Sequence, residues 1–358
     1  MKNYTSTICA TIFAALFSVD AAQACTGITL QSANGNTVMA RTIEWAANDN
    51  HNRYVIVPRG HIWQSLTPDG SQGRTFAARY GYVGFAVEQA EFIVEGINEA
   101  GLSAGLFYFP GYGQYEEFDN NNAATNIADL QLVPFILGSC STIDEVIQAV
   151  LTAHIHNIDP RASTAHWRFG EPGGRQIVLE IIGKKCIFYE NKLGVLTNSP
   201  SFDWQLTNLN NYVNLRTGTI AGNQIGTMEL RSFGGGSGLH GIPGDVTPPS
   251  RFVRAAFYQC SSPTKANADE TVMQAFHILN NFDLPIGIQT LQDDTPTDIP
   301  SATQWTSATD LSGRKIYFKT MYNSHIRCID LNKIDFKRAK FMSEMMDKSK
   351  KEPVEMLF

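Results

Sequence analysis

The stretch Ala22-Gln23-Ala24-Cys25-Thr26-Gly27-Ile28-Thr29-Leu30 decides how the rest of this chain is interpreted. It follows a basic start at Lys2 and an apolar run from Ile8 to Val19. Ala22-Gln23-Ala24 has the small-x-small form after which a signal peptidase cuts. The pattern predicts a leader over residues 1–24 and a protein that is periplasmic or secreted. Cleavage would make Cys25 the first residue of the remaining chain.

A cysteine at an amino terminus carries two reactive groups on one residue. The freed α-amino group has an ordinary pKa of ~7.7–8.0 and the thiol one of ~8.5, so both lie near working pH. The amine can take the thiol proton directly or through one water, so no separate histidine is needed. The stretch therefore indicates an N-terminal nucleophile hydrolase with Cys25 as its nucleophile.

Three other roles for Cys25 fit the same residues. It could form half of a disulfide in an oxidising compartment, or it could be a buried small hydrophobic residue. It could also be the lipidated cysteine of a bacterial lipoprotein, although Ala22 and Gln23 fit that recognition poorly because a larger aliphatic residue is expected at position −3. An exported lipoprotein or binding module anchored through Cys25, without hydrolase activity, is therefore the alternative function.

Length and composition restrict the class of protein. Removing residues 1–24 from the 358-residue chain leaves 334 residues, enough for one large sheet-rich domain over 25–358. The formal charge of −6 argues against nucleic acid as a partner. After the leader, no apolar run approaches the ~18 residues of a transmembrane segment. Four more cysteines would remain, without zinc-like spacing, and are predicted to be buried thiols, with two disulfides as the alternative: Cys140, Cys186, Cys260 and Cys328.

Strand signals flank a turn directly after the quoted stretch. Thr26–Gln31 is rich in β-branched residues, Asn34-Gly35-Asn36 is a strong turn signal, and Thr37–Ile43 resumes the strand pattern. A hairpin with this turn would return the chain alongside its start. It would therefore bring Arg41 and Glu44 near the thiol.

Strands, helices and strands again follow one another along the chain. Helical spacing is expected at 127–137, 142–153, 250–258 and 269–279, with strands before and between these segments and again after residue 304. Within the charged tail, about residues 337–358, the segment Lys337–Lys351 is predicted to be a solvated helix. His154 and His156 are predicted to be solvated histidines at a helix end rather than a metal pair. The element order fits an α+β fold with two sheets packed between helical layers.

Motifs in a fixed order span nearly all of the chain after the leader: Cys25-Thr26-Gly27, Arg41-Thr42-Ile43-Glu44-Trp45, Asn98-Glu99, Phe109-Pro110-Gly111, Leu196-Thr197-Asn198-Ser199-Pro200, His240–Asp245 and Pro249–Arg254. Together they resemble the choloylglycine hydrolase family, which comprises bile salt hydrolases and penicillin V acylases. The resemblance implies a four-layer αββα sandwich of two mainly antiparallel sheets between helical layers. It also implies hydrolysis of a linear amide, no metal or organic cofactor, and a homotetramer.

The resemblance assigns roles to three residues of the hairpin. Cys25 would be the nucleophile, with its α-amino group as the base and later the acid for the leaving amine. Arg41 would favour the thiolate and lower the thiol pKa. Glu44 stands where the family usually has an aspartate that hydrogen-bonds the α-amino group, and its extra methylene changes the reach of the carboxylate. A surface strand arginine and a solvated strand-end acid are the alternatives for Arg41 and Glu44.

The resemblance also assigns an oxyanion hole and a second arginine. Asn198 would direct its side-chain N–H groups at the developing oxyanion, and the Tyr108 backbone N–H would be the second donor. Arg251 would support the charge of the transition state or the carboxyl end of the substrate. The alternatives are a turn asparagine for Asn198 and, for Arg251, a helix-start arginine paired with Asp245.

Substrate preference is expected to depend on Phe107 and Tyr108. Bile salt hydrolases often have asparagine where this chain has Tyr108, so the chain looks like the penicillin V acylase-like branch found in Gram-negative bacteria. Both aromatic residues are expected to line an acyl pocket, or else to be ordinary core aromatics. With Tyr108 in the pocket, phenoxyacetyl groups or long acyl chains would be favoured over a steroid. The small-molecule acyl-amide substrates implied are penicillin V, conjugated bile salts and N-acyl-homoserine lactones.

Overall fold

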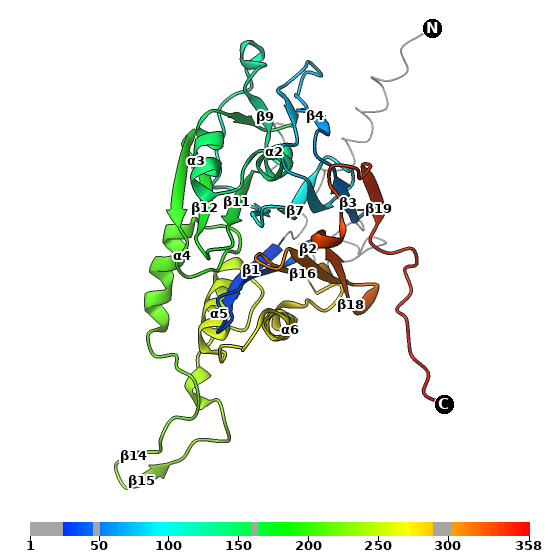
Figure 1. The fold of residues 1–358 in the computed structure, drawn as a ribbon. Helices are drawn as coiled ribbons and strands as arrows, with labels where there is room; N and C mark the ends of the chain where they lie inside the picture. Colours follow the sequence, from blue (N-terminus) through cyan, green and yellow to red (C-terminus); the bar gives the residue numbers. More distant parts are fainter. Residues whose placement is uncertain (1–23, 46–50, 159–163, 289–301) are drawn as a thin grey trace.

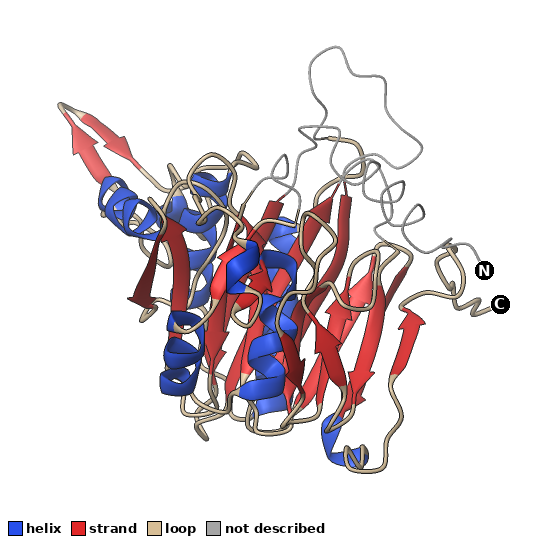
Figure 2. Ribbon diagram, turned by 90° about the horizontal axis from the view of Figure 1, so that it is seen from above, coloured by secondary structure: helices blue, strands red, loops and turns tan. Residues whose placement is uncertain are grey.

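The computed structural model describes residues 24–45, 51–158, 164–288 and 302–358. They form two large sheets with helices outside them (Figures 1 and 2). The predicted leader lies outside the described residues, except for Ala24. Within the described residues, no helix has both the length and the apolar character needed to cross a membrane.

The smaller sheet has five antiparallel strands and begins with the predicted hairpin. Cys25 lies opposite Ile43, and Gly27 lies opposite Arg41. The last third of the chain supplies the remaining strands, so the second strand lies inside the sheet and is almost completely buried. In spatial order the strands are β1 (Ala24–Gln31), β2 (Thr37–Trp45), β16 (Ala302–Asp310), β17 (Lys315–Thr320) and β18 (Asn323–Asp330).

The larger sheet has eight strands, and every neighbouring pair in it is antiparallel. Its central strands are continuous buried runs, as expected for a sheet that is covered on both faces. In spatial order the strands are β13 (Lys185–Glu190), β12 (Gln176–Ile182), β11 (Ala165–Gly170), β8 (Ser103–Tyr108), β7 (Ile93–Asn98), β6 (Tyr82–Ala86), β3 (Arg53–Val57) and β19 (Met342–Met345).

Helices cover the outer face of each sheet, so the predicted αββα order is confirmed. Helices α2 (Leu132–Ser139) and α3 (Ile143–Leu151) pack on the larger sheet, and α5 (Pro248–Ser261) and α6 (Ala268–Leu279) pack on the smaller one (Figure 1). The Thr142 and Asn267 side chains cap α3 and α6 by accepting hydrogen bonds from Glu145 N and Glu270 N. Short elements complete the fold: α4 (Phe202–Asn208), β4 (Ile62–Gln64), β5 (Thr75–Ala77), β9 (Asn126–Ala128), β10 (His154–His156), β14 (Asn223–Ile225) and β15 (Met228–Leu230).

The expected helix over 127–137 begins later than predicted. β9 and β10 pair as parallel strands, so the helix starts only at Leu132. His154 and His156 therefore lie on a strand, and the prediction of solvated helix-end histidines is wrong: His156 is 1% exposed. The pairing joins residues 28 positions apart, and periodicity within a single segment cannot reveal such a contact.

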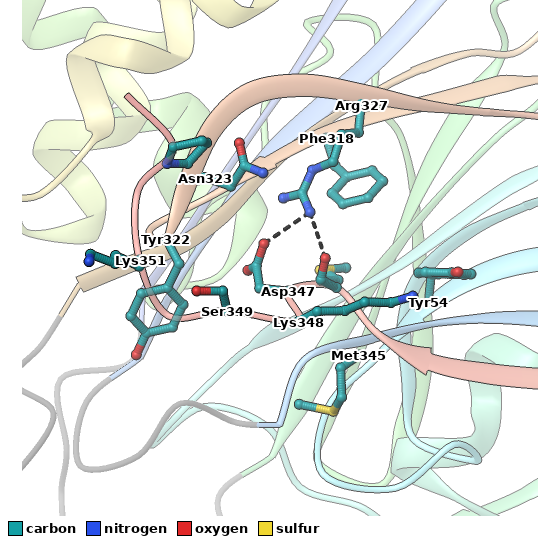
Figure 3. A pocket seen from close by; sticks show the side chains of 12 residues that line it. Tyr54, Phe318, Tyr322, Asn323, Arg327, Met345, Asp347, Lys348, Ser349 and Lys351 are labelled. Carbon is teal, nitrogen blue, oxygen red and sulfur yellow. Dashed lines mark hydrogen bonds and ion pairs between the residues drawn. The ribbon is translucent and has the colours of Figure 1, made fainter. Parts of the chain in front are cut away.

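The predicted helix over 337–351 is also wrong. β19 pairs with β3 and so covers what would otherwise be an open sheet edge. The chain then runs on without regular structure, and Arg327 holds it by donating to Met346 O and to the Asp347 carboxylate. Arg327 and this last segment border a cavity of about 410 Å³, with Phe318 on one wall (Figure 3).

The four cysteines after Cys25 are free thiols, as predicted, but not all of them are buried. Cys140 is buried and Cys186 is partly buried, whereas Cys260 and Cys328 are exposed. Cys260 lies on the solvent side of amphipathic α5, and Cys328 lies in β18, the edge strand of the smaller sheet. Apolar neighbours in the sequence therefore did not indicate burial of the thiol itself.

Candidate active site

The β1–β2 hairpin brings a guanidinium into contact with a thiol. Arg41 Nη2 lies 2.8 Å from the Cys25 sulfur, and neither side chain is more than 4% exposed. The contact follows from the register, because Arg41 lies opposite Gly27, and Cys25, two residues before Gly27, points to the same face of the strand. The predicted proximity of the two residues is thus present.

Other groups fix the orientation of the Arg41 guanidinium. Its Nη1 donates to Leu106 O at 2.6 Å and to Val94 O at 3.2 Å, and lies 3.4 Å from the Glu95 carboxylate. Its Cζ atom lies 3.9 Å from the centre of the Phe107 ring. Phe107 is fully buried. It therefore supports the arginine from within the core and does not line an open surface.

Burial controls the acidity of the thiol. Removal from water raises the pKa of Cys25 above its usual value, and the nearby Glu44 carboxylate adds to this. Arg41, Arg251 and a hydrogen bond from the Tyr108 backbone act in the opposite direction. The expectation that Arg41 lowers the thiol pKa is thus right for that pair, but the desolvation of a buried sulfur outweighs it.

Asn198 lies between the nucleophile and two other predicted residues. Its Oδ1 accepts from the Cys25 backbone N–H at 2.9 Å and from Arg251 Nη2 at 2.7 Å. Its Nδ2 donates to Tyr108 O at 2.7 Å. These partners distinguish the two ends of the Asn198 amide. The end that faces two donors must be the oxygen, and the end that faces a carbonyl oxygen must be the nitrogen. The Tyr108 backbone therefore contacts both Cys25 and Asn198.

Arg251 enters the site from the first turn of α5. Its Nη1 donates to Cys25 O at 2.5 Å and to Thr26 Oγ1 at 2.8 Å, and burial lowers its pKa. Asp245 instead accepts from the hydroxyls of Thr247 and Ser250. The alternative of a helix-start arginine paired with Asp245 is therefore not what the structure has.

Glu44 is buried rather than solvated at a strand end. It lies opposite Ala24, and its side chain approaches Thr303 Oγ1 at 3.5 Å. Its Oε2 has no hydrogen-bond partner among the described residues. Burial raises the pKa of Glu44 to about 7, with Arg251 as the main opposing influence. An unpaired acceptor thus lies where β1 begins.

Sequence reasoning missed two buried charges behind Arg41. Arg168 in β11 donates to Ile28 O at 3.1 Å and to Ala40 O at 3.0 Å, and its Nη2 lies 3.8 Å from the Glu95 carboxylate. Both Arg168 and Glu95 are essentially unexposed. One signal was available in the sequence, because each is the only arginine, lysine, aspartate or glutamate in a mostly apolar strand.

A metal centre would need several ligating side chains close together. In the described part of the chain, no three histidine, cysteine, aspartate or glutamate side chains are grouped so that they could hold an ion. What the structure brings together is a thiol, two arginines, an amide and a carboxyl group. These are the parts needed for a nucleophile with a stabilised negative charge.

Comparison with known proteins agrees with this chemistry. Residues 25–350 match the family model described as linear amide C-N hydrolases, choloylglycine hydrolase family. A bile salt hydrolase/transferase of Clostridium perfringens (strain 13 / Type A) is 32% identical over 317 residues, covering 86% of this chain and 93% of that protein. A penicillin V acylase of Pectobacterium atrosepticum is 25% identical, covering 94% of this chain and 88% of that protein.

Solved structures agree on the fold. A mutant of the conjugated bile acid hydrolase from Clostridium perfringens superposes with a TM-score of 0.80 at 28% identity, covering 93% of this chain and all of that one. The penicillin V acylase from Agrobacterium tumefaciens gives a TM-score of 0.71 at 22% identity, covering 89% and 90% of the two chains. The family model, the relatives and the folds coincide, so this chain belongs to the choloylglycine hydrolase family and is a hydrolase of linear amides.

Proposed function

We propose that this protein is exported, cut after Ala24, and hydrolyses a small acyl amide through Cys25 as an N-terminal nucleophile. One observation carries the proposal. The Cys25 sulfur contacts Arg41 at 2.8 Å, and the Cys25 nitrogen contacts Asn198 at 2.9 Å. Sulfur and nitrogen of one residue thus face two separate polar partners, as a nucleophile and its own base require.

The reaction follows from these contacts. The freed α-amino group takes the thiol proton, and the thiolate attacks the carbonyl carbon of the substrate. Asn198 Nδ2 and the Tyr108 backbone N–H then donate to the tetrahedral oxyanion. The C–N bond breaks as the α-ammonium group protonates the leaving amine, which leaves a thioester. Water, deprotonated by the α-amino group, hydrolyses the thioester and releases the acid.

Glu44 has a place in this scheme. Its buried Oε2 is unpaired among the described residues, and Glu44 lies opposite the residue before Cys25. Once cleavage frees the Cys25 nitrogen, this oxygen is an acceptor for an α-ammonium proton. The added charge would stabilise the Glu44 carboxylate.

The relatives support two of the three proposed substrate classes, conjugated bile salts and penicillin V. The proteins matched in sequence are named bile salt hydrolases and penicillin V acylase. We propose conjugated bile salts, penicillin V and N-acyl-homoserine lactones as the substrates to compare. Tyr108 is proposed to contact the acyl group because its backbone already meets both Cys25 and Asn198.

A homotetramer is proposed for the assembled enzyme. The β14–β15 hairpin extends from the body of the protein (Figures 1 and 2), and it exposes Ile225 and Met228, each at 64%. The nearby Phe233 is fully exposed. Apolar side chains on a projecting hairpin are typical of a contact between subunits.

Mass spectrometry of the purified exported protein, joined to a substrate panel, tests the proposal. We expect a free Cys25 at the amino terminus and turnover of at least one of the three substrate classes. The Cys25→Ser variant should lose turnover while keeping the same circular dichroism spectrum. A diacylglyceryl thioether on Cys25 without turnover would instead establish the anchored, non-enzymatic alternative.

A further inference from the structure

A histidine and a glutamate form a buried pair in the larger sheet, behind the segment that carries Asn198. His166 lies in β11 and Glu180 in β12, two strands that pair in antiparallel register. His166 Nδ1 lies 3.1 Å from Glu180 Oε1, and both side chains are completely buried. The imidazole also stacks on Phe109, with ring centres 4.4 Å apart. The mechanism above uses neither residue.

Hydrogen bonding fixes where the protons of this pair lie. His166 Nε2 lies 3.0 Å from Thr197 O, and a carbonyl oxygen can only accept, so Nε2 carries a hydrogen. One further proton then joins Nδ1 to Glu180 Oε1. The pair is therefore neutral as a unit, as its complete burial requires.

Glu180 makes a second contact with the same segment. Its Oε1 also accepts from the Phe202 backbone N–H at 2.9 Å. The pair thus hydrogen-bonds to the chain at two points, to Thr197 through the imidazole and to Phe202 through the carboxylate. Asn198 lies between these two points, next to Thr197.

We infer that His166 and Glu180 are positioning residues that set the direction of the Asn198 amide toward Cys25. The inference rests on the proposed function, in which Asn198 donates to the oxyanion. The pair hydrogen-bonds to the backbone on either side of Asn198, at Thr197 and Phe202. It therefore affects Cys25 indirectly, by fixing the backbone that carries Asn198. The Asn198 amide must meet Cys25 N, Arg251 and Tyr108 O together, which leaves little tolerance for a shift of the segment.

Glu180→Gln is the sharpest substitution because it keeps the shape and removes the charge. The glutamine oxygen can still accept from Phe202 N–H. A neutral His166 has only one N–H, however, so it can donate either to that oxygen or to Thr197 O, but not to both. His166→Phe keeps the stacking on Phe109 and removes both hydrogen bonds. His61→Phe is the matched control, since His61 also stacks on a phenylalanine, Phe341, with ring centres 4.6 Å apart.

For both variants we expect kcat to fall roughly 10- to 100-fold with KM within about twofold, as for other losses of transition-state positioning. The double variant should be no slower than the slower single variant, because the pair acts as one unit. The control should keep wild-type kcat. The inference would be overturned if the kcat losses of the two single variants added up in the double variant, or if only KM changed.

A second measurement does not depend on turnover. The side-chain N–H₂ signals of Asn198, assigned by ¹⁵N-asparagine labelling and Asn198→Asp, should shift in Glu180→Gln and in His166→Phe but not in His61→Phe. If the wild type hydrolyses no amide while these signals shift, the proposed function fails and the positioning role stands. If the Asn198 signals do not move, the positioning role fails whatever the activity.

Discussion

The Arg41 guanidinium contacts the Cys25 sulfur at 2.8 Å while its other amino group is held by Leu106 O at 2.6 Å. The positive charge is thus fixed in place before any substrate binds. This matters because burial raises the pKa of the thiol, so the thiolate forms only where a fixed charge offsets part of the desolvation. The sulfur and its counter-charge therefore act as one unit.

Replacing Arg41 should make Cys25 less reactive. In Arg41→Met the main influence that lowers the thiol pKa is lost, so the pKa should rise further. The rate at which iodoacetamide alkylates Cys25 can be measured by mass spectrometry at several pH values. In the variant, the increase of this rate with pH should occur at higher pH than in the wild type. We expect kcat/KM to fall roughly 100- to 1000-fold, as for the loss of a preorganised charge. An unchanged alkylation profile would remove Arg41 from thiol activation.

Truncating Asn198 should slow the chemical step more than it weakens binding. Asn198→Ala removes the Nδ2 donor and leaves Cys25 N and Arg251 without their shared acceptor. We expect kcat to fall roughly 100- to 1000-fold, with KM changed much less. Steady-state kinetics on the best substrate of the panel will measure this. A loss confined to KM would place Asn198 in the substrate pocket instead.

The buried Glu44 carboxyl should make stability depend on pH. In the uncleaved chain its pKa is raised from 4.5 to about 7, so the folded state keeps a proton that the unfolded state releases. The free energy of unfolding should therefore fall by up to about 3 kcal/mol as pH rises from 4.5 through 7. Urea titrations at several pH values should show a flatter profile for Glu44→Gln.

Asp129 provides the matched control for this prediction. Burial raises its pKa to about 7 as well, so Asp129→Asn should flatten the stability profile in the same direction. It should leave the pH profile of activity in the processed enzyme unchanged, whereas Glu44→Gln should alter it. Identical activity profiles for both variants would contradict a role for Glu44 beside the α-amino group.

Gly27 is required by close packing next to the nucleophile. A Cβ atom there would lie 2.7 Å from Arg168 Nη1 and 2.9 Å from the Phe107 ring, both deeply buried. Gly27→Ala should therefore destabilise the fold by about 1–3 kcal/mol and reduce activity. Gly173→Ala, which meets nothing within 4 Å, should leave both unchanged. Thermal unfolding and turnover of the two variants will test this. Equal stability and activity in both variants would contradict the close packing at Gly27.

The hairpin and its neighbours show how far sequence patterns reach. The turn at Asn34-Gly35-Asn36 sets the register that places Arg41 opposite Gly27, and this could be predicted because a hairpin is a local structure. The tail after residue 337 shows the limit. Its charges indicate solvent exposure, but its pairing with β3 depends on an edge strand almost 290 positions earlier in the chain. Local patterns carry no information about such a partner.

The sequence by itself determined the predicted nucleophile, the hairpin and the family, because these depend on local turn chemistry and on ordered motifs. Only the tertiary structure decided which groups surround Cys25. Asn198 and Arg251 lie 173 and 226 positions away. Asn198 meets Cys25 because Leu196 pairs with Gly27, and Arg251 meets it because α5 packs on β1. The same packing withdraws the thiol and Glu44 from water, and desolvation, which no single segment possesses, is what raises both pKa values.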